Sequence, residues 1–176
     1  MKRIILFLFL GALGGAVAGF SAGIFIYPFW FLNDVAVEAL APAQERTELA
    51  QGSFIQPDPN DPVHTGTGNV TVFAEEDAGS VVFLHENFEV GPGPRFHVYL
   101  VADGMVRSRR AFLDAEKVDL GRLRNFRGSQ VYAVPPGTDP TRYSSVVIWC
   151  KEFDVLISPA DLIPAMAARD RAKQAS

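Results

Sequence analysis

Apolar positions are distributed unevenly along this chain of 176 residues. An uncharged run from Ile4 to Leu32 comes first, and it exceeds the roughly 20 apolar residues that cross the hydrocarbon core of a bilayer. After about Gly52, short runs of β-branched and aromatic residues alternate with Gly, Pro, Asn and Asp, which is typical of an all-β sandwich or barrel. The pattern predicts one N-terminal transmembrane helix followed by an antiparallel β-sandwich.

The apolar pattern divides the chain into four parts. We expect a cytoplasmic stub and transmembrane anchor over residues 1–32, and a polar juxtamembrane spacer over 33–51, which can hold a short helix broken near Pro42. The β-domain follows over 52–163, and a small, charged, flexible tail over 164–176. The strand-like runs are NVTVFA from Asn69, SVVFLHENFEV from Ser80, RFHVYLVA from Arg95, SQVYAVP from Ser129 and SSVVIWCKEFDVLIS from Ser144.

Alternation along two of these strands predicts which side chains share a face. In RFHVYLVA, Phe96, Val98 and Leu100 point to one side, which we expect to be the core, while His97 points outward. In the last run the predicted faces are Val146, Ile148 and Cys150 on one side, and Val147, Trp149 and Lys151 on the other.

The charges around the apolar run predict its orientation. Lys2 and Arg3 precede it, whereas Asp34 and Glu38 follow it. The positive-inside rule then places the N-terminus in the cytoplasm and the β-domain outside, on a single-pass protein of the cell membrane. The alternative is a cleaved secretory signal, since AVAGFSA resembles a cleavage site. The apolar run continues beyond that site, which favours an uncleaved anchor.

Four glycines recur every fourth residue in the same segment: Gly11, Gly15, Gly19 and Gly23. Small residues in such a ridge let two membrane helices approach closely, so we expect self-association or pairing with another protein. The alternative is that glycine is simply common in membrane helices.

Net charge and its distribution limit the partners. The net charge of −4 predicts no nucleic-acid partner. The segment from Met105 to Arg127 is nevertheless basic, with seven basic and three acidic side chains. Such an edge suits anionic lipid or an acidic partner, and its alternative is a solvated face.

Cys150 is the only cysteine, which excludes an internal disulfide. Its position in line with Val146 and Ile148 is typical of a buried thiol that packs as a small apolar group. A redox thiol or a ligand is the alternative, and it needs a nearby cation or metal. Lys151 points away from the thiol, and Glu152 is expected on its face, so the local sequence does not activate it.

Other chemical motifs are weak or missing. The nucleophile elbow, the phosphate loop and the helical His-Glu-x-x-His motif are absent, so we expect no enzyme activity from this chain alone. Cofactor-binding candidates besides Cys150 are His64, which stands near Asp58 and Asp61, and His97. The Cys-x-x-Cys-His motif for covalent haem is absent, while a non-covalent haem needs only an axial ligand. The sequence assigns no metal.

Several motifs occur in a characteristic order: GSF at Gly52, HTGTG at His64, GPRFHVYL at Gly93, LGRLRNFRGSQVYAVP at Leu120 and YSSVVIWCKEFDVLISPADL at Tyr143. From Gly52 to Leu162 the chain resembles the DM-thirteen domain, an electron-transfer module found beside DOMON domains and in bacterial membrane-anchored proteins. The resemblance implies a β-sandwich.

The resemblance also implies redox chemistry at Cys150, either as a bare thiol or by holding a prosthetic group such as haem. We therefore expect an extracytoplasmic electron-transfer or redox accessory that acts through Cys150. The alternative is a non-catalytic binding or scaffolding module in which Cys150 is purely structural. Arg95 and His97 depart from the family pattern, which leaves the role of His97 open.

Overall fold

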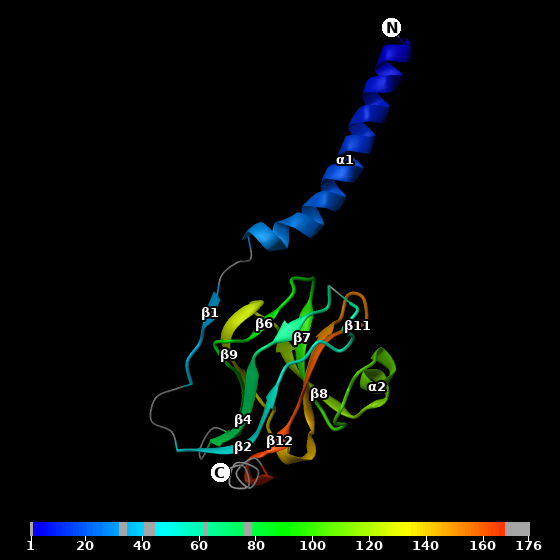
Figure 1. Ribbon diagram of the computed structural model, residues 1–176. Coiled ribbons are helices and arrows are strands. Elements are labelled where there is room, and N and C mark those ends of the chain that lie inside the picture. Colours follow the sequence, from blue (N-terminus) through cyan, green and yellow to red (C-terminus); the bar gives the residue numbers. More distant parts are fainter. Residues whose placement is uncertain (1, 32–34, 41–44, 62, 76–78, 168–176) are drawn as a thin grey trace. The chain divides into compact units, whose positions relative to one another are not determined.

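A computed structural model describes residues 2–31, 35–40, 45–61, 63–75 and 79–167 (Figure 1). The chain divides into two compact units, residues 1–34 and 35–176. The first unit holds helix α1 (Lys2–Phe31), whose segment Arg3–Ile24 is long and apolar enough to cross a membrane. The predicted helix is thus confirmed. An anchor and a signal sequence share this property, so the choice between them stays a prediction.

Two β-sheets form the second unit (Figure 1). The larger sheet has the order β12 (Ile163–Pro164), β2 (Arg46–Ser53), β4 (Asn69–Glu75), β5 (Gly79–Leu84), β9 (Arg127–Ala133), β6 (Glu89–Val90) and β3 (Gly66–Thr67), and β1 (Val35–Val37) pairs with β9. The smaller sheet has the order β11 (Val155–Asp161), β10 (Ser145–Cys150), β7 (Phe96–Val101) and β8 (Lys117–Arg122). Among the described strands, the β1–β9 pair is parallel and the others are antiparallel, which confirms the predicted fold class.

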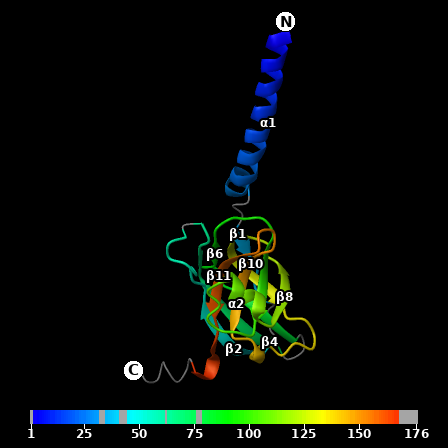
Figure 2. The same ribbon diagram turned by 90° about the vertical axis from the view of Figure 1, so that its right-hand side faces the viewer.

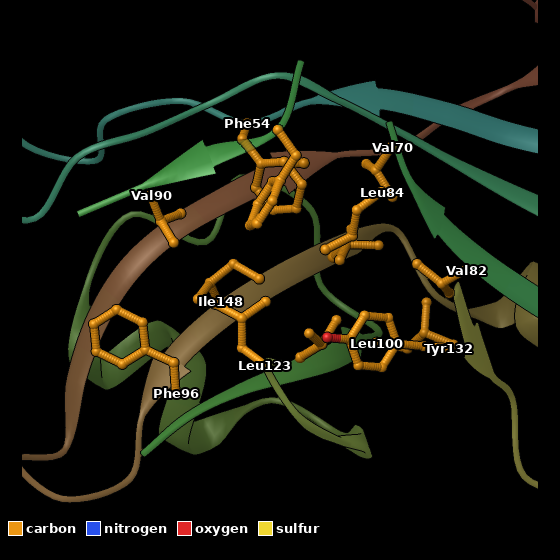
Figure 3. Packing of buried hydrophobic residues seen from close by; sticks show 14 of the residues in the cluster. Phe54, Val70, Val82, Leu84, Val90, Phe96, Leu100, Leu123, Tyr132 and Ile148 are labelled. Atoms are coloured by element: carbon orange, nitrogen blue, oxygen red, sulfur yellow. The ribbon is translucent and has the colours of Figure 1, made fainter. Parts of the chain in front are cut away.

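The main core lies between the two sheets (Figure 3). Leu84 and Tyr132 of the larger sheet belong to the same buried cluster as Leu100 and Ile148 of the smaller one. The predicted inward set of β7, namely Phe96, Val98 and Leu100, lies in this cluster. Because each strand alternates its side chains, one face of each sheet supplies this core.

A second, smaller core covers the other face of the smaller sheet. Tyr99 and Val101 of β7 and Trp149 of β10 pack there with Phe112 of α2 (Arg109–Asp114). Figure 2 shows α2 in front of β10. The sequence did not predict this helix, because it is short; Ser108 begins it by accepting a hydrogen bond from the Ala111 N–H at 3.2 Å. A 3-10 turn spans Pro140–Arg142.

The range 33–51, expected as a spacer, contributes β1 and most of β2 to the larger sheet. The expected short helix is therefore wrong for Val35–Val37 and Arg46–Gln51, while residues 41–44 around Pro42 lie outside the described residues. Helix-forming residues such as Glu48 and Ala50 are overridden here by pairing with β4.

The start of the predicted flexible tail is also part of the fold. Pro164 pairs with Ala50 of β2, and Ala165 is buried. Residues 168–176 of that predicted tail lie outside the described residues.

Candidate functional site

Cys150 is the last residue of β10, and its side chain lies in the main core. Only 2% of the residue is exposed, and it shares the core cluster with Val146 and Ile148. Val147 and Trp149 belong to the second core on the other side of the strand. The predicted division of faces in this strand is confirmed, so the thiol is a buried group.

The polar contact of the thiol is a backbone carbonyl. Cys150 Sγ donates to the Pro94 carbonyl oxygen at 3.2 Å. In the part of the chain that the structure describes, no charged side chain forms a hydrogen bond or an ion pair with Sγ. A carbonyl oxygen can only accept, so the thiol is the donor in this contact.

The backbone on both sides of Cys150 is unusual. Arg95, next to Pro94, has φ 51°, and Asp154 in the turn after β10 also has φ 51°. Residues with a Cβ seldom adopt this left-handed region. The Arg95 carbonyl accepts the Lys151 N–H at 3.2 Å, which ties the two segments together. The residue that follows the Pro94 carbonyl is thus left-handed and hydrogen-bonded to the residue that follows Cys150.

The neighbours of Cys150 in sequence point elsewhere. Lys151 Nζ donates to Asp119 Oδ2 at 2.6 Å, on the face opposite the thiol, as alternation predicts. Glu152 was expected on the face of Cys150, but it is exposed in the turn that follows β10 and lies 3.4 Å from Arg95. The alternation ends where the strand ends, and for this reason the expectation for Glu152 is wrong.

A haem held by sulfur needs an open face beside Sγ and space for the ring. Cys150 is instead enclosed in a cluster that includes Phe96 and Ile148, with Pro94 as its hydrogen-bond acceptor. The residues around the thiol therefore do not fit a haem ligated by Cys150.

His64 lies apart from Cys150, in the loop after β2. Its Nδ1 lies 2.5 Å from Asp61 Oδ2, and this contact helps to lower the pKa of Asp61 to about 2. Asp58 accepts the backbone N–H of Asn60, and Asp61 accepts that of Val63, so both carboxylates also cap local turns. Among the described residues, no group of three His, Cys, Asp or Glu side chains is placed to hold a metal ion.

His97 belongs to a polar cluster that the sequence did not predict. Its Nδ1 lies 2.9 Å from Asp119 Oδ1, while Tyr99 Oη donates to Asp119 Oδ2 at 3.2 Å. Burial opposes ionisation of Asp119, but hydrogen bonds from Lys151 and His97 outweigh it and hold the pKa of Asp119 at about 2. This His97 cluster (His97, Tyr99, Asp119 and Lys151) therefore centres on a carboxylate.

The His97 cluster was missed because its members come from three segments. Asp119 lies on β8, which lacks a strong apolar alternation, and it reaches His97 only through the β7–β8 pairing. His97 was expected on the outward face of its strand, either toward solvent or against the sheet face, and 17% of its side chain is exposed. The signal that could have found the cluster is the polar, oxidisable or titratable character of the outward positions His97 and Tyr99.

The basic segment from Met105 to Arg127 is largely paired with acids. Its ion pairs are Arg107–Asp161, Arg109–Asp154, Arg110–Asp114, Arg124–Glu38 and Arg127–Glu89. Pairing with carboxylates from other parts of the chain reduces the net positive field of this edge. The basic side chains of this segment are thus mostly exposed and paired with carboxylates, which favours the alternative of a solvated face.

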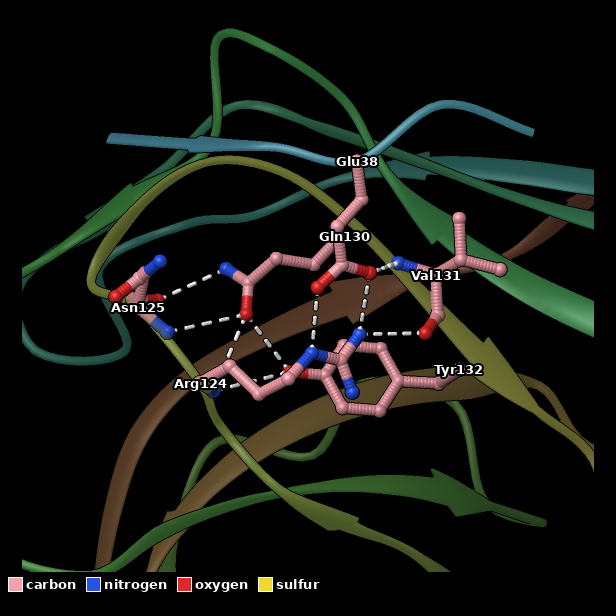
Figure 4. A network of polar contacts seen from close by, with 6 residues as sticks. All are labelled: Glu38, Arg124, Asn125, Gln130, Val131 and Tyr132. Carbon is pink, nitrogen blue, oxygen red and sulfur yellow. Dashed lines mark hydrogen bonds and ion pairs between the residues drawn. The ribbon is translucent and has the colours of Figure 1, made fainter. Parts of the chain in front are cut away.

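One of these pairs fastens β1 to the domain (Figure 4). Glu38 accepts two hydrogen bonds from Arg124, both of 2.6 Å, and a third from the Val131 N–H at 2.9 Å. Arg124 lies over the Tyr132 ring, 4.3 Å from its centroid. Tyr132 Oη donates to Gln130 Oε1 at 2.8 Å, so the surface pair connects to buried groups.

A comparison with protein-family models finds a match to one family. The model described as Electron transfer DM13 matches residues 60–162, which is more than half of the chain and includes Cys150, His64 and His97. A comparison with curated proteins finds no match. A comparison with solved structures finds no match either. The match covers the whole smaller sheet and strands β3, β4, β5, β6 and β9 of the larger one, and the chain therefore belongs to the electron transfer DM13 family.

Proposed function

We propose that this protein is a membrane-anchored electron-transfer module that acts through Cys150. The family match carries the proposal, since it spans the smaller sheet and includes the only cysteine of the chain. The Pro94 carbonyl and the two left-handed residues beside the thiol support it, because strained backbone tends to occur at functional positions.

The burial of Cys150 limits the chemistry that we propose. A thiol that is 2% exposed does not meet the sulfur of a partner protein without local opening. We therefore propose electron exchange through the protein rather than disulfide exchange at the surface.

The location follows from the N-terminal segment. We propose that α1 is retained as an anchor, with Lys2 and Arg3 in the cytoplasm and the β-domain outside. Protease added to cells, with any outer envelope permeabilised, should then digest the β-domain. A protected domain would contradict the orientation, and a mature form beginning near Gly19 would contradict the retained anchor.

Substitution of the thiol tests the electron-transfer role. We compare Cys150→Ala and Cys150→Ser with Val146→Ala in the full chain, purified in detergent, because Val146 is buried on the same face of β10. The measurements are the melting temperature, voltammetry of the adsorbed protein and rescue of a deletion strain. If Cys150 transfers electrons, both Cys150 variants lose the voltammetric signal and fail to rescue.

The matched control separates chemistry from packing. Val146→Ala removes methyl groups from the same core and should lower stability while keeping the electron exchange. If Cys150 only packs, Cys150→Ala and Cys150→Ser should both rescue, because alanine keeps the position apolar and a serine hydroxyl can donate to the Pro94 carbonyl that the thiol meets. A fully functional Cys150→Ala strain would overturn the proposed role of the thiol.

A further inference from the structure

Two oxidisable aromatic side chains lie on the face of the smaller sheet that is opposite Cys150. Tyr99 is on β7, Trp149 is on β10, and Trp149 immediately precedes the thiol in the chain. We propose that Tyr99 is a one-electron redox site coupled to proton transfer to Asp119, and that Trp149 links it to the strand of Cys150. The relay deepens the proposed function and rests on it for its biological purpose.

The phenol of Tyr99 is already placed on a proton acceptor. Tyr99 is 7% exposed, and its Oη donates to Asp119 Oδ2 at 3.2 Å. Burial, together with the charge of Asp119, raises the pKa of Tyr99, so the phenol stays protonated before oxidation. Removing an electron from a phenol makes its proton strongly acidic, and here that proton has a carboxylate within reach.

Asp119 connects the phenol to a titratable ring. Its Oδ2, which accepts from Tyr99, lies 3.1 Å from His97 Nδ1. Lys151 Nζ at 2.6 Å and the Gly121 N–H at 2.9 Å keep the carboxylate ionised and fixed in place. The other charged group beside His97 is Arg122, its register partner on β8. A proton that leaves Tyr99 therefore has a carboxylate one hydrogen bond away, and His97 and Lys151 hold that carboxylate in place.

The rings form a continuous path from Tyr99 toward the strand of Cys150. The centroid of the Tyr99 ring lies 5.1 Å from that of Phe112, and Phe112 stacks on Trp149 with centroids 4.0 Å apart. Trp149 is 2% exposed, so the indole is shielded from water. Phe112 itself is hard to oxidise. It fills the short gap between Tyr99 and Trp149, which are both easier to oxidise.

Oxidation of Tyr99 conserves atoms and electrons. An outer-sphere one-electron acceptor takes one electron from Tyr99, and the phenolic O–H bond breaks. The proton moves to Asp119 Oδ2, which becomes a carboxylic acid, while His97 keeps the Nδ1 proton that it donates to Asp119. The products are a neutral phenoxyl radical, a protonated Asp119 and the reduced acceptor. A one-electron donor reverses every change.

Flash oxidation tests the relay in the full chain in detergent. A photo-oxidised ruthenium polypyridyl complex serves as the one-electron acceptor, and transient absorption with electron paramagnetic resonance follows the radicals. Wild type should form a phenoxyl radical that Tyr99→Phe largely removes. Asp119→Asn, which keeps Tyr99, should slow its formation by at least about tenfold, because a positioned acceptor contributes on the order of 10²–10⁴ to proton transfer. Wild type should also show an indolyl radical at Trp149, and Trp149→Phe should remove it.

Tyr132→Phe is the matched control. Tyr132 is also buried, but its Oη donates to the neutral amide of Gln130 rather than to a carboxylate. This variant should keep the phenoxyl radical. An unchanged yield in Tyr99→Phe, or an unchanged rate in folded Asp119→Asn, would overturn the relay.

The same measurement in the Cys150→Ala variant tests the relay separately from the role of Cys150. In Cys150→Ala the Tyr99 radical should still form, even if the voltammetric signal of the thiol is lost. Loss of the thiol signal in that variant together with a persistent Tyr99 radical supports both ideas. A thiol signal in the wild type with no Tyr99 radical overturns the relay alone.

Discussion

Replacing Gly128 by alanine should release β1 from the domain. Gly128 pairs with Ala36 in the parallel β1–β9 ladder and has φ +87°. A Cβ at this position would lie 2.7 Å from Val35 Cγ1 and 2.9 Å from the Ala36 nitrogen, and closer still to the Ala36 carbonyl oxygen. Two of these three atoms belong to the backbone, so β1 must move.

The expected loss of stability has two parts. Forcing alanine into a left-handed conformation costs about 1–2 kcal/mol. Moving β1 also breaks the hydrogen bond from the Glu38 N–H to the Ser129 carbonyl, which contributes about 1 kcal/mol, and loosens the half-exposed Glu38–Arg124 pair, worth at most about 1 kcal/mol. We therefore expect Gly128→Ala to lower the free energy of unfolding by about 2–4 kcal/mol.

Gly137→Ala isolates the backbone strain. Gly137 has φ +82°, and nothing lies within 4 Å of the Cβ that alanine would add there. This variant should lose only about 1–2 kcal/mol. Denaturant titration of the full chain in detergent measures both losses, and hydrogen exchange should show lost protection near Glu38 in Gly128→Ala alone. Equal losses with unchanged exchange near Glu38 would refute the reasoning.

Three further predictions concern the His97 cluster, the second core and the helix. The pKa of Asp119, about 2, is below its ordinary 3.8. The stability that this shift contributes is present above about pH 4 and is lost as the pH falls toward 2. In Asp119→Asn the melting temperature should therefore fall less steeply between about pH 4 and pH 2 than in the wild type. Phe112→Ala should cost about 3–5 kcal/mol of unfolding free energy, whereas the exposed Phe153→Ala should stay within about 0.5 kcal/mol; equal losses in denaturant would contradict the second core. Gly15→Ile combined with Gly19→Ile should weaken helix association in a membrane reporter assay, and equal signals would leave these glycines as ordinary membrane composition.

The sequence determined the features that depend on local periodicity. A run without charges makes a helix of membrane-spanning length, and alternation sets the faces of β7 and β10. Alternation alone therefore placed Cys150 in line with Val146 and Ile148, and the thiol lies with them in the core. Ordered motifs over the same strands also identified the family, which the match to residues 60–162 confirms.

Only the tertiary structure decided the contacts between distant segments. Asp119 meets His97 across 22 positions and Lys151 across 32, and Glu38 meets Arg124 across 86. Periodicity repeats within one element and carries no information about which strand becomes its neighbour. Sheet register fixes those neighbours, and register depends on the packing of both sheets at once. For the same reason β1, which is short and flanked by polar residues, could be identified as a strand only from its pairing with β9.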